Sequence, residues 1–221
     1  MSEAAAYKLA SVLLQYPTVA LFDGISELDA FAATTSPRQA RTAFARFLAW
    51  LRATDPADVA QHYVQTFDLP QSSGGREGSS PRRQQSRCAL YLTYYRYGDT
   101  RKRGMAMLAF KSAYRTAGFE PSDDDLPDYL PLVLDFAALT PRGEALLHAH
   151  RADLELLRRA LHQAGTPYAH ITDAVCAQLP RPGPRDLALI RQYWGQEPPA
   201  EQVGRQPFAP SQYLTGEGVP P

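Results

Sequence analysis

Proline follows a short, oxygen-bearing residue at four places in the chain, and each pair introduces a stretch with helical spacing. The pairs are Ser36-Pro37, Asp55-Pro56, Thr140-Pro141 and Thr166-Pro167. A side-chain oxygen at the N-cap accepts a hydrogen bond from the first turn, and proline suits the first helical position because no donor is needed there. Apolar residues then recur every three or four positions. The sequence therefore predicts helices that begin at these pairs.

Helical spacing extends along most of the chain, and apolar and polar residues never alternate for long enough to indicate a strand. With 221 residues and 44% apolar content, the chain can fill one sizeable core. We therefore expect an all-α, single-domain antiparallel bundle of about nine helices. The expected helices cover approximately residues 5–15, 19–31, 37–52, 56–67, 88–97, 100–117, 127–139, 141–164 and 167–179, with a last short piece at 186–194.

Two of these helices carry specific expectations about burial and length. In the helix at 100–117 we expect Met105, Leu108 and Tyr114 to face the core. The stretch at 141–164 is expected to form one long, regular helix that ends at Gly165, because a glycine commonly closes a helix in the left-handed conformation.

Two segments lack helical spacing. Residues 70–87 read PQSSGGREGSSPRRQQSR and contain no apolar residue, so they cannot bury enough surface to offset the entropy of ordering. We expect a flexible loop there. The segment at 196–221 is rich in proline and is expected to be an irregular tail. The helical domain is therefore expected to span residues 1–195.

Charge and composition exclude several classes of function. The chain has 23 Lys and Arg against 23 Asp and Glu, so no net positive field draws it to nucleic acid. No apolar run reaches the roughly 20 residues of a membrane helix, and we expect no membrane insertion. The N-terminus has no signal-peptide pattern, and Cys88 and Cys176 do not indicate a disulfide framework. These features favour a cytoplasmic protein.

The usual catalytic and metal-binding patterns are missing. His148 and His150 stand two apart, so on a helix their rings point in directions about 200° apart and cannot chelate together. No G-x-S-x-G nucleophile motif occurs, and the glycines at 74–78 follow no strand and match no phosphate loop. We therefore expect no enzyme activity, no metal and no cofactor of its own.

The stretch at 123–136, DDDLPDYLPLVLDF, joins an acidic entrance to an apolar helix. Pro127 and Pro131 mark the helix start, where the helix dipole favours the carboxylates of residues 123–125. Those three acids have an alternative role as simple capping residues. Asp128 and Asp135 are seven apart, which places them on one helical face, beside a stripe of aromatic residues. Such a face suits a peptide with basic residues and apolar anchors.

Three segments resemble one known family: HYVQTFDL (62–69), CALYLTYYRYGDTRKRGMAML (88–108) and DDDLPDYLPLVLDFAAL (123–139). They are similar to the assembly chaperones of respiratory nitrate reductase, the NarJ family, within the all-helical redox-enzyme maturation chaperones. The terminal segments YKLASVLLQYP and PFAPSQYL also resemble that family's ends. Family members often carry histidine where Tyr129 stands, and their connection after Leu69 is shorter.

The resemblance implies a non-catalytic cytoplasmic chaperone. It would bind the apo catalytic (alpha) subunit of nitrate reductase, including that subunit's N-terminal peptide, until the molybdenum cofactor is inserted and before membrane docking. Two alternatives remain: direct carriage of the molybdenum cofactor, and maturation of another molybdoenzyme. The residues we expect to bind the partner peptide are aromatic or acidic: Tyr63, Phe67, Asp68, Tyr94, Asp125, Asp128, Tyr129 and Asp135.

Overall fold

The computed structural model of the protein describes residues 3–68, 88–98, 100–121, 125–196 and 199. Over these residues the fold is all-helical, as predicted, and the helices number twelve where we expected about nine. The predicted loop at 70–87 and all but residues 196 and 199 of the predicted tail lie outside the described residues. The helices are α1 Glu3–Leu13, α2 Val19–Asp23, α3 Ile25–Ala33, α4 Arg38–Ala53, α5 Pro56–Phe67, α6 Tyr94–Tyr97, α7 Arg101–Thr116, α8 Leu130–Leu139, α9 Pro141–Ala149, α10 Arg151–Ala164, α11 Ala169–Cys176 and α12 Pro184–Tyr193.

The capping pairs place two helix starts as predicted. Asp55 Oδ1 accepts a hydrogen bond from the backbone N–H of Ala57 at 2.9 Å, and α5 begins at Pro56. Thr140 Oγ1 accepts one from Gly143 at 3.1 Å, and α9 begins at Pro141. The other two pairs stand slightly further from the helices that they precede, since α4 begins at Arg38 and α11 at Ala169.

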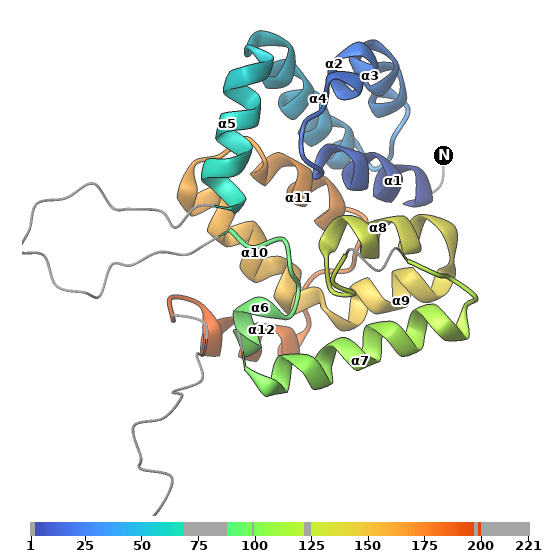
Figure 1. Cartoon of the computed structure of the whole chain (residues 1–221), viewed down its shortest axis with the longest axis vertical. Helices are drawn as coiled ribbons and strands as arrows, with labels where there is room; N and C mark the ends of the chain where they lie inside the picture. Colours follow the sequence, from blue (N-terminus) through green and yellow to red (C-terminus); the bar gives the residue numbers. More distant parts are fainter. Residues whose placement is uncertain (1–2, 69–87, 99, 122–124, 197–198, 200–221) are drawn as a thin grey trace, which may run out of the picture.

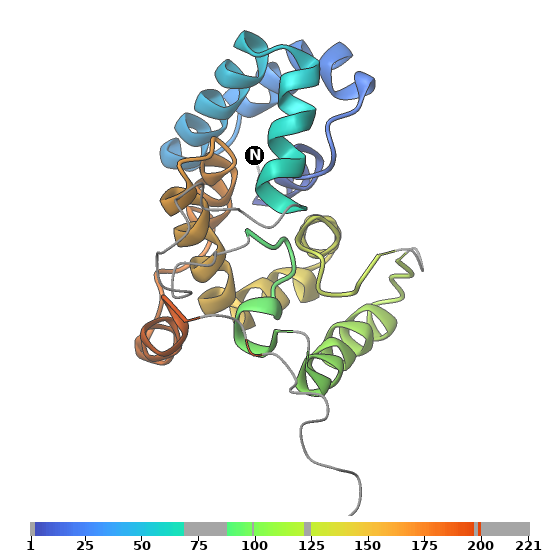
Figure 2. The ribbon, with the colours of Figure 1, turned by 60° about the vertical axis from the view of Figure 1, so that its left-hand side comes forward.

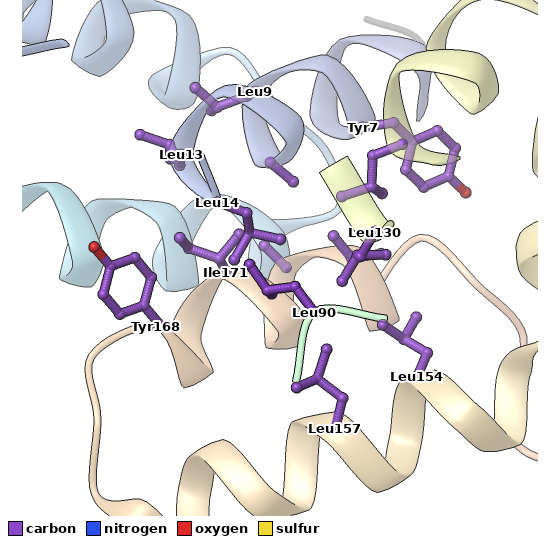
Figure 3. Close-up of a cluster of buried hydrophobic side chains, with 14 of the residues drawn as sticks. Tyr7, Leu9, Leu13, Leu14, Leu90, Leu130, Leu154, Leu157, Tyr168 and Ile171 are labelled. Carbon is purple, nitrogen blue, oxygen red and sulfur yellow. The ribbon is translucent and has the colours of Figure 1, made fainter. Parts of the chain in front are cut away.

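The helices surround a main hydrophobic core that draws residues from α1 through α11, and a small second cluster of Ala152, Leu156 and Ile190 joins α10 to α12. α1 packs against α8 and α11, α8 packs against α9, and α4 lies along α11. Figures 1 and 2 show α5 at one end of the molecule and α7 along the opposite edge. Figure 3 shows how side chains distant in sequence meet in the interior, among them Leu14, Leu90, Leu130, Leu157 and Ile171.

Two predicted helices are each divided into two. The stretch at 19–31 breaks at Gly24 into α2 and α3. The stretch at 141–164 breaks at His150, whose φ of −104° and ψ of 24° are not helical. At this break the His150 ring lies 2.8 Å from the buried carboxylate of Asp153, which also holds Arg96 of α6 at 2.5 Å. The break allows α9 to pack on α8 and α10 to pack on α11 and α12.

The predicted helix at 88–97 is wrong for its first six residues. Only α6, Tyr94–Tyr97, is helical, and residues 88–93 run extended or in a turn. Their backbone bonds to the segment before α8: Leu92 N–H donates to Asp128 O at 3.0 Å, and Leu130 N–H donates to Leu90 O at 2.7 Å. An isolated antiparallel bridge between Tyr91 and Tyr129 results. Within the described residues, no strand longer than this single bridge is present.

Helix α7 is placed as predicted but turned differently about its axis. Phe110 and Tyr114 are buried, which confirms the prediction for Tyr114. The predictions for Met105 and Leu108 are wrong, since these side chains are 70% and 54% exposed. The two large aromatic rings bury more apolar area than Met105 and Leu108 would, and they set the inward face of the helix.

Candidate functional site

The acidic stretch ahead of α8 separates its carboxylates into buried and exposed groups. The helix begins at Leu130, so Asp128 precedes it and does not share a helical face with Asp135. Asp128 is fully buried, whereas Asp125 is exposed. The predicted face formed by Asp128 and Asp135 is therefore wrong, because the helix starts later than Pro127. Asp123 and Asp124 lie outside the described residues, and Asp125 stands five residues before the helix, too far to cap it.

Asp128 holds three parts of the chain together. Its Oδ2 accepts hydrogen bonds from the Thr93 hydroxyl at 2.5 Å and the Thr93 backbone N–H at 3.3 Å. The same oxygen lies 3.5 Å from Nη2 of Arg103 on α7. A buried carboxylate needs such partners, because taking an unpaired charge out of water is costly. Asp128 therefore has a structural role.

Arg103 also lies over two tyrosine rings. Its guanidinium carbon is 5.2 Å from the ring centroid of Tyr91 and 5.9 Å from that of Tyr94, distances typical of cation–π contacts. This contact connects Tyr94, one of the predicted residues, to Tyr91, which we did not predict. Tyr91 packs in turn on Tyr129, with ring centroids 5.6 Å apart.

The end of α5 carries a second group of aromatic side chains. Tyr63 packs on Phe67 at 4.8 Å between ring centroids and on Tyr16 at 5.5 Å. Its hydroxyl donates to the carbonyl oxygen of Leu14 at 3.2 Å, and burial, together with the nearby Tyr129, raises its pKa. The end of α5, the 88–93 segment and the start of α8 therefore converge, as Figure 2 shows.

Three carboxylates border these aromatic groups. Asp125 and Asp135 line a shallow pocket together with Gln15, Tyr129, Pro131 and Leu132. Asp68 is the exposed C-cap residue of α5. Asp135 is paired with Lys8 of α1 at 2.9 Å, whereas neither Asp68 nor Asp125 forms an ion pair with a described residue. The border is thus acidic and only partly neutralised.

Tyrosine pKa values reflect this setting. Burial raises the pKa of Tyr129, and the nearby carboxylates of Asp125 and Asp68 raise it further. Burial and the charge of Asp128 likewise raise the pKa of Tyr91, although Arg103 opposes that effect. Both phenols therefore stay protonated at neutral pH and can donate hydrogen bonds. The site combines neutral phenol donors with negative carboxylates.

We call this region the acidic–aromatic surface and define it by eight residues. It contains six of the eight predicted residues, Tyr63, Phe67, Asp68, Asp125, Tyr129 and Asp135, and in addition Tyr16 and Tyr91. Tyr63 is buried and contributes by packing against the more exposed rings of Phe67 and Tyr16. The other two predicted residues, Asp128 and Tyr94, both contact Arg103 and are connected to the surface through it. The sequence signal for Tyr91 was the alternation of side chains in Leu90-Tyr91-Leu92, as in a strand. In the structure the two leucines are buried and Tyr91 is half-buried.

The described residues give little support for a metal site or a catalytic cysteine. No group of three or more His, Cys, Asp or Glu side chains there is arranged to hold a metal ion. Cys88 and Cys176 are free thiols, and burial raises the pKa of each to about 12. A catalytic cysteine needs a lowered pKa to supply thiolate at neutral pH. Among the described residues, no helix has the length and apolar character to cross a membrane.

A family model described as the nitrate reductase delta subunit matches residues 34–172, which include α4 through the first half of α11 and the acidic–aromatic surface apart from Tyr16. The chain belongs to this family. The match accounts for the resemblance of the three segments at 62–69, 88–108 and 123–139, because all of them lie within it.

Characterised relatives agree with that membership. The chain is 28% identical to the probable nitrate reductase molybdenum cofactor assembly chaperone NarJ of Bacillus subtilis, over 80% of this chain and 89% of the relative. It is 32% identical to the Escherichia coli K12 chaperone NarJ, over 75% of this chain and 65% of that protein. It is 39% identical to the nitrate reductase-like protein NarX of Mycobacterium tuberculosis over 77% of this chain, which spans only 24% of NarX.

Proposed function

We propose that this protein is a non-catalytic maturation chaperone for a respiratory nitrate reductase. It binds the apo catalytic subunit in the cytoplasm, keeps it open while the molybdenum cofactor is inserted, and leaves before the subunit docks at the membrane. Family membership and the names of the NarJ relatives support this proposal. The protein contributes binding surface and no catalytic group.

The acidic–aromatic surface is the part of the molecule that binds the subunit's N-terminal segment. The observation that carries this assignment is the exposure of Asp68 and Asp125 beside aromatic rings, without a described ion-pair partner. Free carboxylates at the border attract arginine and lysine, and aromatic faces accept both apolar side chains and guanidinium groups. A segment with basic residues spaced around apolar anchors matches both features.

The ion pair between Lys8 and Asp135 gives the surface a replaceable cation. Lys8 is 58% exposed, so the pair contributes little to the stability of the fold. An arginine from the partner segment can take the place of Lys8 and form two parallel hydrogen bonds with the carboxylate, which a lysine cannot do. Displacement of Lys8 therefore favours partners that bring arginine to this position.

Selective capture of the apo subunit tests the proposed function. The tagged chaperone is mixed with the nitrate reductase catalytic subunit purified from cells with and without molybdenum cofactor synthesis. We expect the apo subunit to be retained and the cofactor-loaded subunit to pass through. Equal retention of both forms, or of neither, would contradict the chaperone role.

Mass spectrometry of the intact protein distinguishes this function from cofactor carriage. A chaperone purified alone from cofactor-producing cells should have the mass of the polypeptide only. A bound pterin nucleotide would show instead that the protein carries the cofactor itself.

A further inference from the structure

Helix α7 presents a second charged surface, opposite in sign to the acidic–aromatic surface. Its 16 residues, RKRGMAMLAFKSAYRT, contain five Lys and Arg and no Asp or Glu. In the sequence, the nearest acids are Asp99 and Glu120, which precede and follow the helix. All the charged side chains of α7 are therefore basic, although the net charge of the whole chain is zero.

The buried and exposed sides of α7 divide these residues clearly. Phe110 and Tyr114 are buried against the bundle, and Arg103 on the same side reaches Asp128. The opposite side carries Met105 and Leu108, which are 70% and 54% exposed. At 100° per residue these two side chains lie within 60° of each other and about 140–160° from Phe110. Arg101, at the start of the helix, lies 180° from Phe110 and between these two directions, so the solvent face carries apolar side chains together with a cation.

Other basic residues lie on both sides of Met105 and Leu108 around the helix. Lys111 and Arg115 lie along one edge and Lys102 along the other, and all three are exposed. None of the three forms an ion pair with a described residue. Figures 1 and 2 both show α7 along the outer edge of the molecule, so its full length of about 24 Å can be approached.

We propose that the solvent face of α7 docks the protein on an anionic lipid surface. A helix that carries both exposed apolar residues and cations on its outer face, and no acids, has the pattern of an interfacial helix, which lies in the headgroup plane. Met105 and Leu108 would enter the acyl boundary while the cations contact lipid phosphates. Only two apolar residues are available, so the contact is peripheral and reversible.

The shape of the face favours lipid over an acidic protein segment. A peptide helix binds in a groove formed by several elements. Here the exposed side chains of one straight helix form a convex ridge, which a planar surface contacts along its length. Phosphate groups spaced across a bilayer can pair with cations on both edges at once.

Vesicle flotation with the full-length protein tests the proposal. Neutral phosphatidylcholine vesicles are compared with vesicles that contain about one half phosphatidylglycerol, at about 0.05 M and about 0.5 M salt. We expect the protein to float with the anionic vesicles at low salt and with neither type at high salt. The triple variant Lys102→Glu, Lys111→Glu, Arg115→Glu should float about tenfold less.

Matched variants separate a local surface from a change in net charge. Arg38→Glu, Arg41→Glu and Arg185→Glu alter the net charge equally at exposed positions of α4 and α12, and this variant should float as the wild type does. Met105→Ser with Leu108→Ser should also reduce flotation, whereas Val19→Ser with Leu139→Ser, which changes other exposed apolar residues, should not. Circular dichroism confirms that every variant is folded.

Three results would overturn the proposal. They are equal flotation with neutral vesicles, no flotation with anionic vesicles, and a triple α7 variant that floats like the wild type. If the protein ignores vesicles but is retained by polyglutamate through the same three cations, the face belongs to an acidic protein partner and the lipid proposal fails. Capture of the apo subunit is measured without lipid, so its outcome does not depend on this one.

Discussion

Asp125 and Asp128 are three positions apart, yet one side chain is exposed and the other is fully buried. The difference comes from the turn before α8, which directs Asp128 towards Thr93 and Arg103. Removing the charge of Asp128 takes away a buried carboxylate that lies 3.5 Å from the guanidinium of Arg103, which is only 11% exposed. The two acids should therefore respond differently to the same substitution.

We predict that Asp128→Asn lowers the free energy of unfolding by about 2 kcal/mol or more. Asp125→Asn should change that free energy by less than about 0.5 kcal/mol, because the side chain is exposed, and should weaken peptide binding instead. Urea unfolding followed by circular dichroism measures both values. Equal stability of the two variants would show that the buried pair contributes nothing.

At the scale of elements, helices α8 and α9 approach so closely that one position excludes a side chain. A Cβ atom added to Gly143 would lie 2.3 Å from the backbone nitrogen of Ala137 and 2.4 Å from the carbonyl carbon of Phe136. Real Cβ atoms do not come that close to backbone, so the two helices would have to separate. Gly104 on α7 differs, since nothing lies within 4 Å of the same added atom.

We predict opposite effects for alanine at these two helical glycines. Gly143→Ala should destabilise the fold by more than about 2 kcal/mol, although alanine favours helix formation. Gly104→Ala should stabilise it by up to about 1 kcal/mol. Thermal unfolding of both variants provides the comparison. A stabilised Gly143→Ala variant would mean that α8 and α9 pack less tightly than described.

A network of ion pairs joins α10 to α11. Glu155 accepts hydrogen bonds from Arg158 at 2.8 Å and Arg159 at 3.1 Å, and Arg158 also reaches Asp173 of α11 at 2.9 Å. Burial of Glu155 opposes its ionisation, but the hydrogen bonds from Arg158 and Arg159 outweigh that effect and lower its pKa from 4.5 to about 2. Between about pH 2 and pH 4.5, the folded state therefore binds fewer protons than the unfolded state.

We predict a stability contribution from Glu155 that depends on pH. Because the folded pKa is depressed, the contribution is complete above about pH 4.5 and is lost as the pH falls to about 2. Glu155→Gln should therefore be less stable than the wild type near neutral pH, with a difference that shrinks at acidic pH. Urea midpoints measured across this range check the prediction. A difference that stays constant with pH would refute the assigned cause.

The sequence predicted correctly those helix starts that depend on residues close by in the chain. The starts of α5 and α9 follow from capping at Asp55 and Thr140, which involves neighbours within three residues. The extended path of 88–93 depends on backbone partners at Asp128 and Leu130, more than 35 residues later. The break at His150 likewise accompanies a contact with Arg96 through Asp153. Spacing along the chain carries no information about such partners.

At the scale of the whole molecule, the fold class was predictable because periodicity and composition both indicated helices around one core. Six of the eight residues of the acidic–aromatic surface were named from the sequence, but their arrangement was not predictable. Its residues come from the segment after α1, the end of α5, the 88–93 segment, and α8 with the segment before it, and only the folded chain brings them together. The buried position of Asp128 and the contribution of Tyr91 required that geometry.

The molecule therefore has two charged surfaces, an acidic–aromatic one at the junction of α5 and α8 and a basic one on α7. In both proposals, a chain with zero net charge binds charged partners through local surfaces of opposite sign, since each field acts over roughly a Debye length of about 10 Å. The acidic–aromatic surface is central to the proposed function, and a direct measurement of binding tests it.

Calorimetric titration with a peptide from the N-terminus of a nitrate reductase catalytic subunit is that measurement. The wild type should bind at tens of micromolar peptide or below, and Asp68→Asn with Asp125→Asn should weaken binding about tenfold, or about 1.4 kcal/mol. Asp23→Asn with Glu27→Gln, which removes two exposed acids elsewhere, should bind like the wild type. Absence of heat with the wild type, or equal affinity in both double variants, would contradict the account.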